Sequence, residues 1–317
     1  MEILKLNPVF KDYIWGGTKL RDEFGLETDI DPVAEGWMLS CHKDGMNTVC
    51  GGEFDGKTLQ EIIDGDSKEK ILGTSSLKFP YFPILIKLID AKDNLSIQVH
   101  PDNEYAARVE HEFGKTEIWY VLDADEDAKL VYGFKDKISK EDFRKAIEDN
   151  TLMDVLNVVN VKKGDLFFIE AGTVHAIGKG TLIAEIQQNS NSTYRVYDYG
   201  RIGKDGKPRE LHIDKAVDVS VTEPAKFGTK PFGCEEKTDG GKVQLLTKCD
   251  LFTVYRYVAD GKITLNAGAD SFNSVLCVDG CAEINGVKMK KGDSFFVPAN
   301  YGEYTVGGNA EFLVTKI

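Results

Sequence analysis

The sequence predicts a mainly β protein built of two related barrel-like units with short helical inserts. Most of the chain consists of short apolar strands between glycine-rich turns, and residues 244–317 continue as strand after strand. Residues 163–171 (KGDLFFIEA) return as residues 291–299 (KGDSFFVPA), and residues 119–124 can be aligned with residues 275–280. An internal repeat of this kind indicates two copies of one structural unit. We therefore expect one unit within residues 1–235 and a second within residues 240–317.

In the first unit, two short helices and two strands precede the candidate site. Leu20 and Phe24 define one face of the first helix, and Thr58 opens a capping box before the second. Residues 34–40 have the composition of a strand, and residues 82–90 form an almost continuous apolar run, which indicates a strand buried on both faces. Lys87 interrupts this run, and its position fits equally an edge lysine or a site lysine. His42 has no evident partner, so we expect a surface or core histidine.

Two helical inserts and a linker complete the predicted elements. The first insert begins at Asp102 as its cap and is expected to stop at Gly114, and the second begins at Ser139. Residues 222–242 are rich in Gly, Pro, Lys and Glu, which is typical of a linker. Beyond it we expect turns at residues 260–261, 279–280 and 285–286.

The composition restricts the possible environments and partners. The chain has 317 residues, of which 42% are hydrophobic and 29% charged, as in globular proteins, and its net charge is −13. This negative charge disfavours nonspecific binding to nucleic acid or to an anionic membrane. The first residues carry no signal-peptide pattern, and the six cysteines lack metal-binding or redox spacing. We therefore expect a cytoplasmic protein with reduced thiols.

Polar side chains on two strand ends form a candidate metal site. Alternation along residues 95–101 places Ser96, Gln98 and His100 on one face, Glu117 opens the next apolar run, and His175 ends the strand and turn of residues 164–175. Two imidazoles, a carboxylate and an amide suit a divalent metal with one open position, although such a set can also be an ordinary polar sheet face.

The repeat favours the metal site over an ordinary polar face. In our alignment His175 falls on Glu303 and Glu117 falls on Asn273, so the second copy keeps the sheet pattern and loses the ligands. A purely structural role in the barrel would not require this asymmetry.

These features together resemble the cupin superfamily, whose fold is a double-stranded β-helix or jelly roll. More specifically, the chain is similar to the type I mannose-6-phosphate isomerases in their short bacterial form. Four segments are the most specific: QVHP at 98–101, GKTE at 114–117, GTVHA at 172–176, and Glu185 followed ten residues later by Arg195. Residues 13–16, 34–37 and 194–199 extend the match. At position 191, where an aspartate commonly stands, this chain has Asn191, so we expect no acid–base role there.

The resemblance implies one zinc ion per chain and a set of active-site residues. The implied zinc ligands are the residues that match Gln98, His100, Glu117 and His175. The match also implies catalytic roles for Lys115, Glu185 and Arg195.

The implied reaction interconverts mannose 6-phosphate and fructose 6-phosphate through a cis-enediol. Zinc would stabilise the enediolate charge, and a base must move a proton between C2 and C1. Glu185 and Lys115 are both candidates for this base. Arg195 suits the substrate phosphate best, supported by Lys87 or Lys115, and Ser96 is a further candidate substrate contact.

Two other function classes remain open at this stage. An iron or manganese cupin could be a dioxygenase, although a glutamine ligand suits a redox-inert metal better. A non-catalytic sugar-binding cupin would keep the pocket without needing Lys115, Glu185 and Arg195 together. The sequence leaves the quaternary structure as a monomer or a weak homodimer, with a small phosphorylated sugar as the partner.

Overall fold

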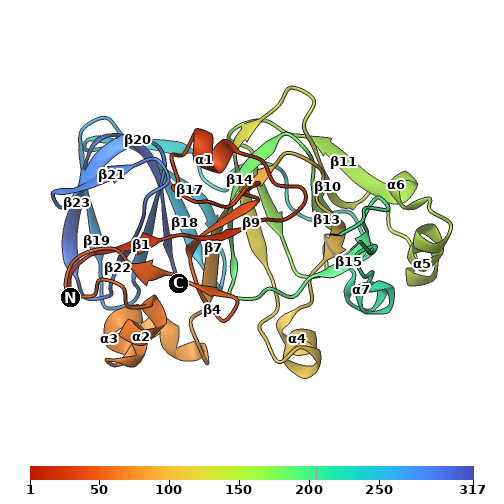
Figure 1. Ribbon diagram of the computed structural model, residues 1–317, viewed down its shortest axis with the longest axis horizontal. Helices are drawn as coiled ribbons and strands as arrows, with labels where there is room; N and C mark the ends of the chain where they lie inside the picture. The colour runs from red at the N-terminus through yellow and green to blue at the C-terminus, as the bar shows by residue number, and fades with distance from the viewer. Residues whose placement is uncertain (204–205) are drawn as a thin grey trace.

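Two β units lie side by side in the protein, and helices cover one end and the lower side (Figure 1). The structure is a computed structural model that describes residues 1–203 and 206–317. Its strands form three large antiparallel sheets and a two-stranded hairpin, which confirms the mainly β prediction. Within the described residues, no helix has both the length and the apolar character needed to cross a membrane.

The first unit is a sandwich of a six-stranded and a five-stranded sheet. The six-stranded sheet has the order β12-β9-β14-β7-β3-β2, and the five-stranded sheet the order β11-β10-β13-β8-β15. The strands of these two sheets are β2 (Val9–Lys11), β3 (Glu35–Leu39), β7 (Ile84–Ala91), β8 (Ile97–Val99), β9 (Glu117–Ala124), β10 (Lys129–Phe134), β11 (Leu156–Asn160), β12 (Leu166–Ile169), β13 (His175–Ile177), β14 (Thr181–Gln188) and β15 (Tyr194–Tyr197). Inward side chains of both sheets, such as Trp119, Phe167 and Tyr132, fill the space between them.

The helices are short and lie outside the sandwich. They are α1 (Lys19–Asp22), α2 (Leu59–Asp64), α3 (Lys68–Leu72), α4 (Asn103–Val109), α5 (Lys140–Glu148), α6 (Leu152–Val155) and α7 (Ile213–Val219), with a 3₁₀ turn at Thr74–Lys78. Phe143 of α5 and Ala216 of α7 pack on Val99 and Val174 and so cover the outer face of the five-stranded sheet, at the right of Figure 1. The hairpin of β4 (Cys41–His42) and β5 (Gly45–Met46) follows β3.

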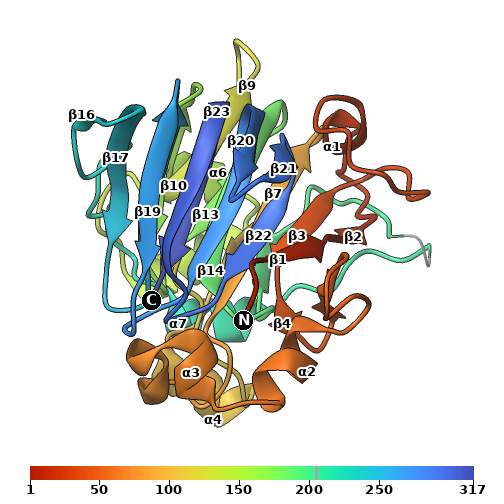
Figure 2. The same ribbon diagram turned by 90° about the vertical axis from the view of Figure 1, so that its left-hand side faces the viewer.

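The second unit contains a ten-stranded sheet that the N-terminus joins. Its strands are β1 (Leu4–Asn7), β6 (Thr48–Val49), β16 (Glu235–Thr238), β17 (Gly241–Lys248), β18 (Thr253–Ala259), β19 (Lys262–Ala267), β20 (Asn273–Ile284), β21 (Val287–Lys290), β22 (Ser294–Val297) and β23 (Gly302–Lys316). Strand β1 pairs with β22, from the opposite end of the chain (Figure 2). The division of the chain near residue 240 therefore stays a proposal.

The outer face of the six-stranded sheet packs against the second unit. Ile86 and Ile118 from the first unit share one apolar core with Phe272, Leu276 and Phe296 from the second. This contact explains the continuous apolar run at residues 82–90, because β7 is buried throughout its length and has apolar neighbours on both sides. The prediction of a strand buried on both faces is confirmed.

Strand pairing in the two units shows the repeat directly. Glu117 pairs with Ile169 in the first unit, and Asn273 pairs with Val297 in the second, in the register that the sequence alignment predicts. The placement of His175 on Glu303 is wrong: Glu303 is exposed, whereas Tyr304 is buried and pairs with Leu265 as His175 pairs with Gln98.

The shift arises because the turn before this strand is one residue longer in the second copy. There the hydroxyl of Tyr304 accepts a hydrogen bond from Asn273 Nδ2 at 2.9 Å, so an apolar and amide-containing interior replaces the candidate metal site.

Local signals in the sequence were reliable where a side chain caps a helix. Thr58, Asp102 and Ser139 cap α2, α4 and α5 as predicted. Gly114 does not stop α4, which ends at Val109; a side chain at Gly114 would lie 2.4 Å from the backbone of Asp102. That glycine allows two backbone segments to approach closely.

Two predictions in the second half of the chain are also wrong. Residues 279–280 are not a turn but lie within β20, next to a bulge between Cys277 and Asp279. The left-handed conformation of Gly280, with φ of 75°, accompanies that bulge. Residues 235–242 are not only a linker, because β16 and the start of β17 form a hairpin there.

Candidate active site

Four predicted metal ligands meet at one end of the sandwich interior. Gln98 lies in β8, His100 just after it, and Glu117 and His175 open β9 and β13. Antiparallel pairing sets His175 directly opposite Gln98. Ligand atoms of the two histidines and Glu117 all lie within 4.8 Å of one another, and these three residues are fully buried.

The distances within this cluster suit atoms that share one cation. His100 Nε2 lies 3.7 Å from Glu117 Oε2, and His175 Nε2 lies 3.6 Å from Glu117 Oε1. The amide nitrogen of Gln98 lies 3.4 Å from His175 Nε2. A half-turn of that amide exchanges its nitrogen and oxygen without changing its shape and would present Oε1 to the cluster.

Hydrogen bonds behind the histidines prepare both rings as metal ligands. Nδ1 of His100 donates to the carbonyl of Ser192 at 2.9 Å, and Nδ1 of His175 donates to the carbonyl of Thr173 at 2.8 Å. The proton on each Nδ1 leaves Nε2 unprotonated, as an acceptor that faces the cluster. Burial lowers the pKa of His175 to about 3 and that of His100 well below its usual value, so both rings are neutral.

Glu117 completes a donor set that fits zinc. Both of its carboxylate oxygens are buried; Oε2 is ion-paired with the ammonium of Lys115 at 2.7 Å, and Oε1 has no hydrogen-bond partner among the residues that the structure describes. Burial, followed by the repulsion of Glu185, raises the pKa of Glu117, a cost that a bound cation would relieve. Two imidazole nitrogens, one carboxylate and one amide oxygen are ligands that Zn²⁺ accepts while keeping an open position.

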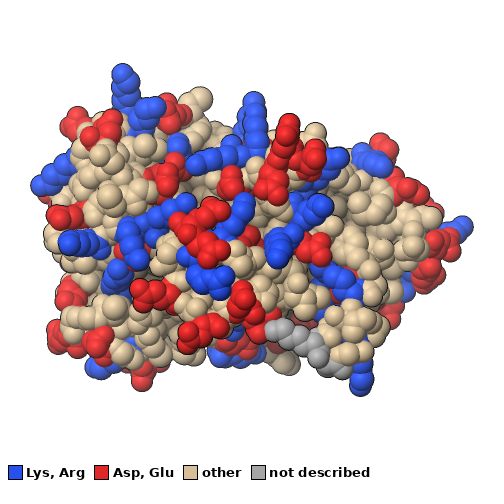
Figure 3. Space-filling model, turned by 45° about the horizontal axis from the view of Figure 1, so that its top comes forward, with Lys and Arg blue, Asp and Glu red and all other residues tan. Residues whose placement is uncertain are grey.

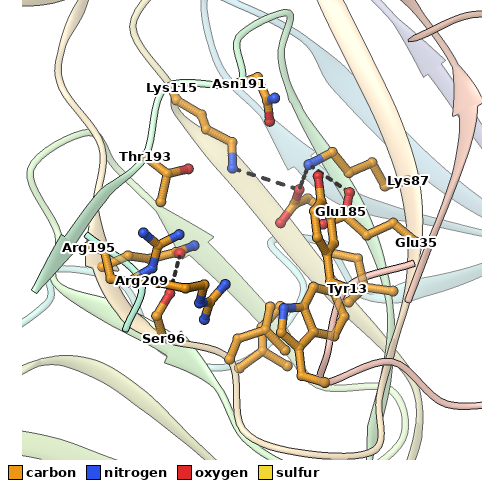
Figure 4. Close-up of a pocket in the computed structure, with 15 residues that line it drawn as sticks. Tyr13, Glu35, Lys87, Ser96, Lys115, Glu185, Asn191, Thr193, Arg195 and Arg209 are labelled. Atoms are coloured by element: carbon orange, nitrogen blue, oxygen red, sulfur yellow. Dashed lines mark hydrogen bonds and ion pairs between the residues drawn. The ribbon is translucent and has the colours of Figure 1, made fainter. Parts of the chain in front are cut away.

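Next to the cluster, two lysines and two glutamates form a buried charge network (Figure 4). Lys87 Nζ lies 3.2 Å from Glu185 Oε1 and 3.5 Å from Glu35 Oε2. Glu185 Oε2 accepts a hydrogen bond from Trp119 Nε1 at 2.9 Å, and Lys115 Nζ lies 3.8 Å from its other oxygen. Burial raises the pKa of Glu185, but Lys115 and Lys87 outweigh it, so its pKa lies below the usual value.

These groups border a cavity of about 260 Å³. Its lining residues are Tyr13, Trp15, Glu35, Lys87, Ile89, Leu95, Ser96, Gln98, Lys115, Ile177, Glu185, Asn191, Thr193, Arg195 and Arg209. Gln98 of the metal cluster lines this cavity, as does Lys115, which contacts Glu117, so the cavity opens onto the cluster. Lys87 is buried and lines this cavity, so it is not an exposed edge lysine, and its role in the site stays a prediction.

Cations gather on the cavity wall opposite the buried glutamates. On the face shown in Figure 3, basic and acidic side chains are mixed. In the cavity, by contrast, Arg195 and Arg209 lie together in Figure 4, with Ser96 beside them. Arg195 pairs with Gln98 across β15 and β8, and its guanidinium donates to the carbonyl of Glu210 at 2.9 Å. Its buried Nε has no hydrogen-bond partner within residues 1–203 and 206–317.

All the predicted site residues are therefore neighbours, and among the lining residues that sequence reasoning missed are Tyr13, Glu35, Thr193 and Arg209. Tyr13 and Glu35 lie in segments that carried the family resemblance but were given no role. Thr193 and Arg209 had no signal in the sequence. Arg209 is held by the buried carboxylate of Asp198, with Arg209 Nε 2.7 Å from Oδ2.

The structure also places the two residues for which the sequence predicts no catalytic or metal-binding role. His42 has partners after all: it is buried, its Nδ1 accepts a hydrogen bond from the backbone N–H of Asp44 at 3.1 Å, and Glu112 lies near its other nitrogen. Asn191 lines the cavity, and its Nδ2 donates to Asp44 Oδ2 at 2.9 Å.

Comparison with known proteins identifies similar sequences and folds. Residues 3–136 match the family "Phosphomannose isomerase type I, catalytic domain", and residues 242–317 match "Mannose-6-phosphate isomerase, cupin domain". Mannose-6-phosphate isomerase ManA of Bacillus subtilis is 37% identical over 321 residues, covering 100% of this chain and 99% of that protein. Mannose-6-phosphate isomerase of Streptococcus mutans is 37% identical, covering 95% and 94%.

A solved structure has the same fold over the whole chain. The crystal structure of the mannose 6-phosphate isomerase from Bacillus subtilis superposes with a TM-score of 0.92 at 35% identity, covering 100% of both chains.

Proposed function

Since this chain belongs to the type I phosphomannose isomerase family, we propose that it interconverts mannose 6-phosphate and fructose 6-phosphate with one zinc ion per chain. The observation that carries this proposal is the buried cluster of His100, Glu117 and His175 at the end of a cavity lined by cations. Two neutral imidazoles that aim Nε2 at one carboxylate, all within 4.8 Å of one another, are the arrangement that ligands of a single divalent cation adopt, and Lys115 alone contacts only Glu117 and His100 among them.

Gln98, His100, Glu117 and His175 would hold the zinc ion. Bound zinc supplies Lewis acidity, which stabilises negative charge on the two sugar oxygens that exchange their roles. Side chains that line the cavity would carry out the proton transfers and bind the phosphate.

Glu185 is the base that we propose for the carbon-bound proton. Its carboxylate is ionised because Lys87 and Lys115 hold its pKa down, and it borders the cavity. It would take the proton from C2 of the open-chain aldose and return it to C1 of a cis-enediol. The hydrogen bond from Trp119 and the ion pair with Lys87 fix its orientation.

Lys115 lies between the metal cluster and Glu185 and would transfer a proton between the sugar oxygens. Its ammonium is 2.7 Å from Glu117 and 3.2 Å from His100 Nε2. A proton must also pass from O2 to O1 during the reaction; the ammonium can donate a proton to O1, and the amine that results can accept the proton of O2.

Arg195 and Arg209 would bind the phosphate of the substrate. Guanidinium groups bind phosphate oxygens through two parallel hydrogen bonds, and Arg195 Nε has a free donor for this purpose. Ser96 lines the same part of the cavity and is a further candidate contact. A cytoplasmic location and a monomeric or weakly dimeric state stay predictions.

An assay that couples fructose 6-phosphate formation to a dehydrogenase tests this function. We expect turnover of mannose 6-phosphate by the purified protein, loss of turnover after chelation and recovery with zinc. No turnover at any metal loading would contradict the isomerase. Metal-independent turnover would contradict the metal site alone.

A further inference from the structure

Glu112 lies outside the cavity and bridges two segments that frame it. Its Oε1 lies 2.9 Å from Nζ of Lys43, in the turn between β4 and β5, and 3.7 Å from Nε2 of His42, the last residue of β4. Its Oε2 accepts hydrogen bonds from the backbone N–H of Asn191 at 3.4 Å and from the hydroxyl of Ser192 at 3.3 Å. The two carboxylate oxygens thus contact different segments: Oε1 contacts the β4–β5 hairpin, and Oε2 contacts residues 191–192.

The segment on the Oε2 side carries parts of the active site. The carbonyl of Ser192 accepts the hydrogen bond from His100 Nδ1 at 2.9 Å, and the side chains of Asn191 and Thr193 line the cavity. Only one other hydrogen bond described in the structure holds the backbone of residue 192, from its N–H to the hydroxyl of Ser190 at 3.2 Å. A shift of this loop would therefore move the carbonyl that orients His100.

The segment on the Oε1 side is firmly anchored. His42 is buried and meets the ring of Trp37 edge-on at 5.9 Å between centroids. Because its Nδ1 accepts a hydrogen bond from the N–H of Asp44, the neutral ring carries its proton on Nε2, which faces Glu112. Glu112 thus ties the loop of residues 191–192 to a fixed part of the sandwich.

The backbone before Glu112 is bent in a way that aims its side chain. Helix α4 ends at Val109, and His111 adopts the left-handed conformation with φ of 57°. Left-handed backbone is uncommon for residues other than glycine. It turns the chain from α4 toward Gly114 and Lys115, and Glu112 is left between the two segments that it joins.

We propose that Glu112 is a positioning residue for the metal ligand His100, acting through the loop of residues 191–192. This inference rests on the proposed metal function. Glu112 touches neither the metal cluster nor the cavity; it fixes the Ser192 carbonyl, which fixes the tautomer and orientation of the imidazole. Partners behind a metal ligand typically change metal affinity about 10- to 100-fold when they are removed.

The zinc affinity of Glu112→Ala measures this role. Competition with a chromogenic chelator should give zinc binding about tenfold weaker than in the wild type. Glu112→Gln keeps an oxygen acceptor for the loop and should recover most of that loss, and Ser192→Ala should fall between. Glu311→Ala is the matched control, because Glu311 is also half-buried and ion-paired, with Arg256 at 2.8 Å, but lies between the two units. It should bind zinc as the wild type does.

Equal zinc affinity in Glu112→Ala and the wild type would overturn the inference. So would equal weakening in Glu112→Ala and Glu311→Ala, since that pattern reports general destabilisation. A second readout needs no metal: solvent exchange of the His100 Nδ1 proton, followed by NMR in the metal-free protein, should be faster in Glu112→Ala. If the wild type retained no zinc, the proposed function would fail, while this exchange rate would still decide whether Glu112 positions His100.

Discussion

Replacing Lys87 by methionine removes the cation that two buried carboxylates share. The ammonium lies 3.2 Å from Glu185 and 3.5 Å from Glu35, and the side chains of these three residues are 5%, 3% and 9% exposed. Methionine has a similar volume, so packing against Trp37 is preserved while the charge is lost. Leaving a buried charge without its partner typically costs about 3–5 kcal/mol, and we expect that loss in the free energy of unfolding.

A double mutant separates this charge effect from any packing defect. Glu35→Gln alone should cost about 1–2 kcal/mol, because Trp37 Nε1 donates to Glu35 at 2.7 Å and keeps only a neutral acceptor. The double mutant Lys87→Met, Glu35→Gln lacks both the ammonium of Lys87 and the carboxylate of Glu35. Of these three groups only the carboxylate of Glu185 is left, and Lys115 is still 3.8 Å from it. The double mutant should therefore be less destabilised than the sum of the single mutants, by about 1–3 kcal/mol.

Urea unfolding of the metal-free protein, followed by tryptophan fluorescence, gives the four free energies. Chelator is present throughout, so zinc binding does not add to the stability of any variant. A cost for Lys87→Met below about 1 kcal/mol, or costs that simply add in the double mutant, would refute the shared-cation reasoning.

Three other predictions concern pH, phosphate binding and proton transfer. Burial lowers the pKa of His100 and His175 in the folded state, that of His175 to about 3. Below about pH 6.5 the unfolded state therefore binds protons that the metal-free folded state does not bind. Each histidine should therefore contribute a loss of stability of up to about 1.4 kcal/mol per pH unit as the pH falls below 6.5, for His175 down to about pH 3, whereas Glu117, whose pKa is raised to about 7, opposes this loss above pH 4.5. A His175→Gln variant whose slope equals that of the wild type would contradict this. Arg195→Lys keeps the charge but loses the paired hydrogen bonds, so kcat/KM should drop by the equivalent of about 2–4 kcal/mol, and an unchanged value would exclude a phosphate or enediolate contact. Isomerisation in heavy water should place deuterium at C1 of fructose 6-phosphate if Glu185 or Lys115 exchanges its proton with solvent; full transfer of C2 deuterium to C1 over many turnovers would favour a hydride shift.

Predictions from local patterns succeeded where the pattern depends on neighbours in sequence. Alternation along a strand placed Gln98 and His100 on the inner face, and cap residues marked the starts of three helices. The repeat then distinguished functional from structural polar residues, because Asn273 replaces Glu117 in an equivalent strand pair.

The errors arose where tertiary contacts decide the structure. Gly114 looked like a helix stop but is required by a close approach to Asp102, which the sequence does not reveal. A one-residue difference in turn length moved the counterpart of His175 from Glu303 to Tyr304, a shift that reverses the face of a strand. Arg209 reaches the cavity from an irregular segment, and no periodicity marks such a residue.

Metal stoichiometry measured together with turnover tests the account most directly. Chelated protein is titrated with zinc, and the rate of fructose 6-phosphate formation is plotted against bound zinc per chain. The account predicts a linear rise that ends at one zinc per chain, and no zinc-dependent rise in His175→Ala or Glu117→Ala that retain the fold. Full activity without bound zinc, or stoichiometric zinc in either variant, would contradict it.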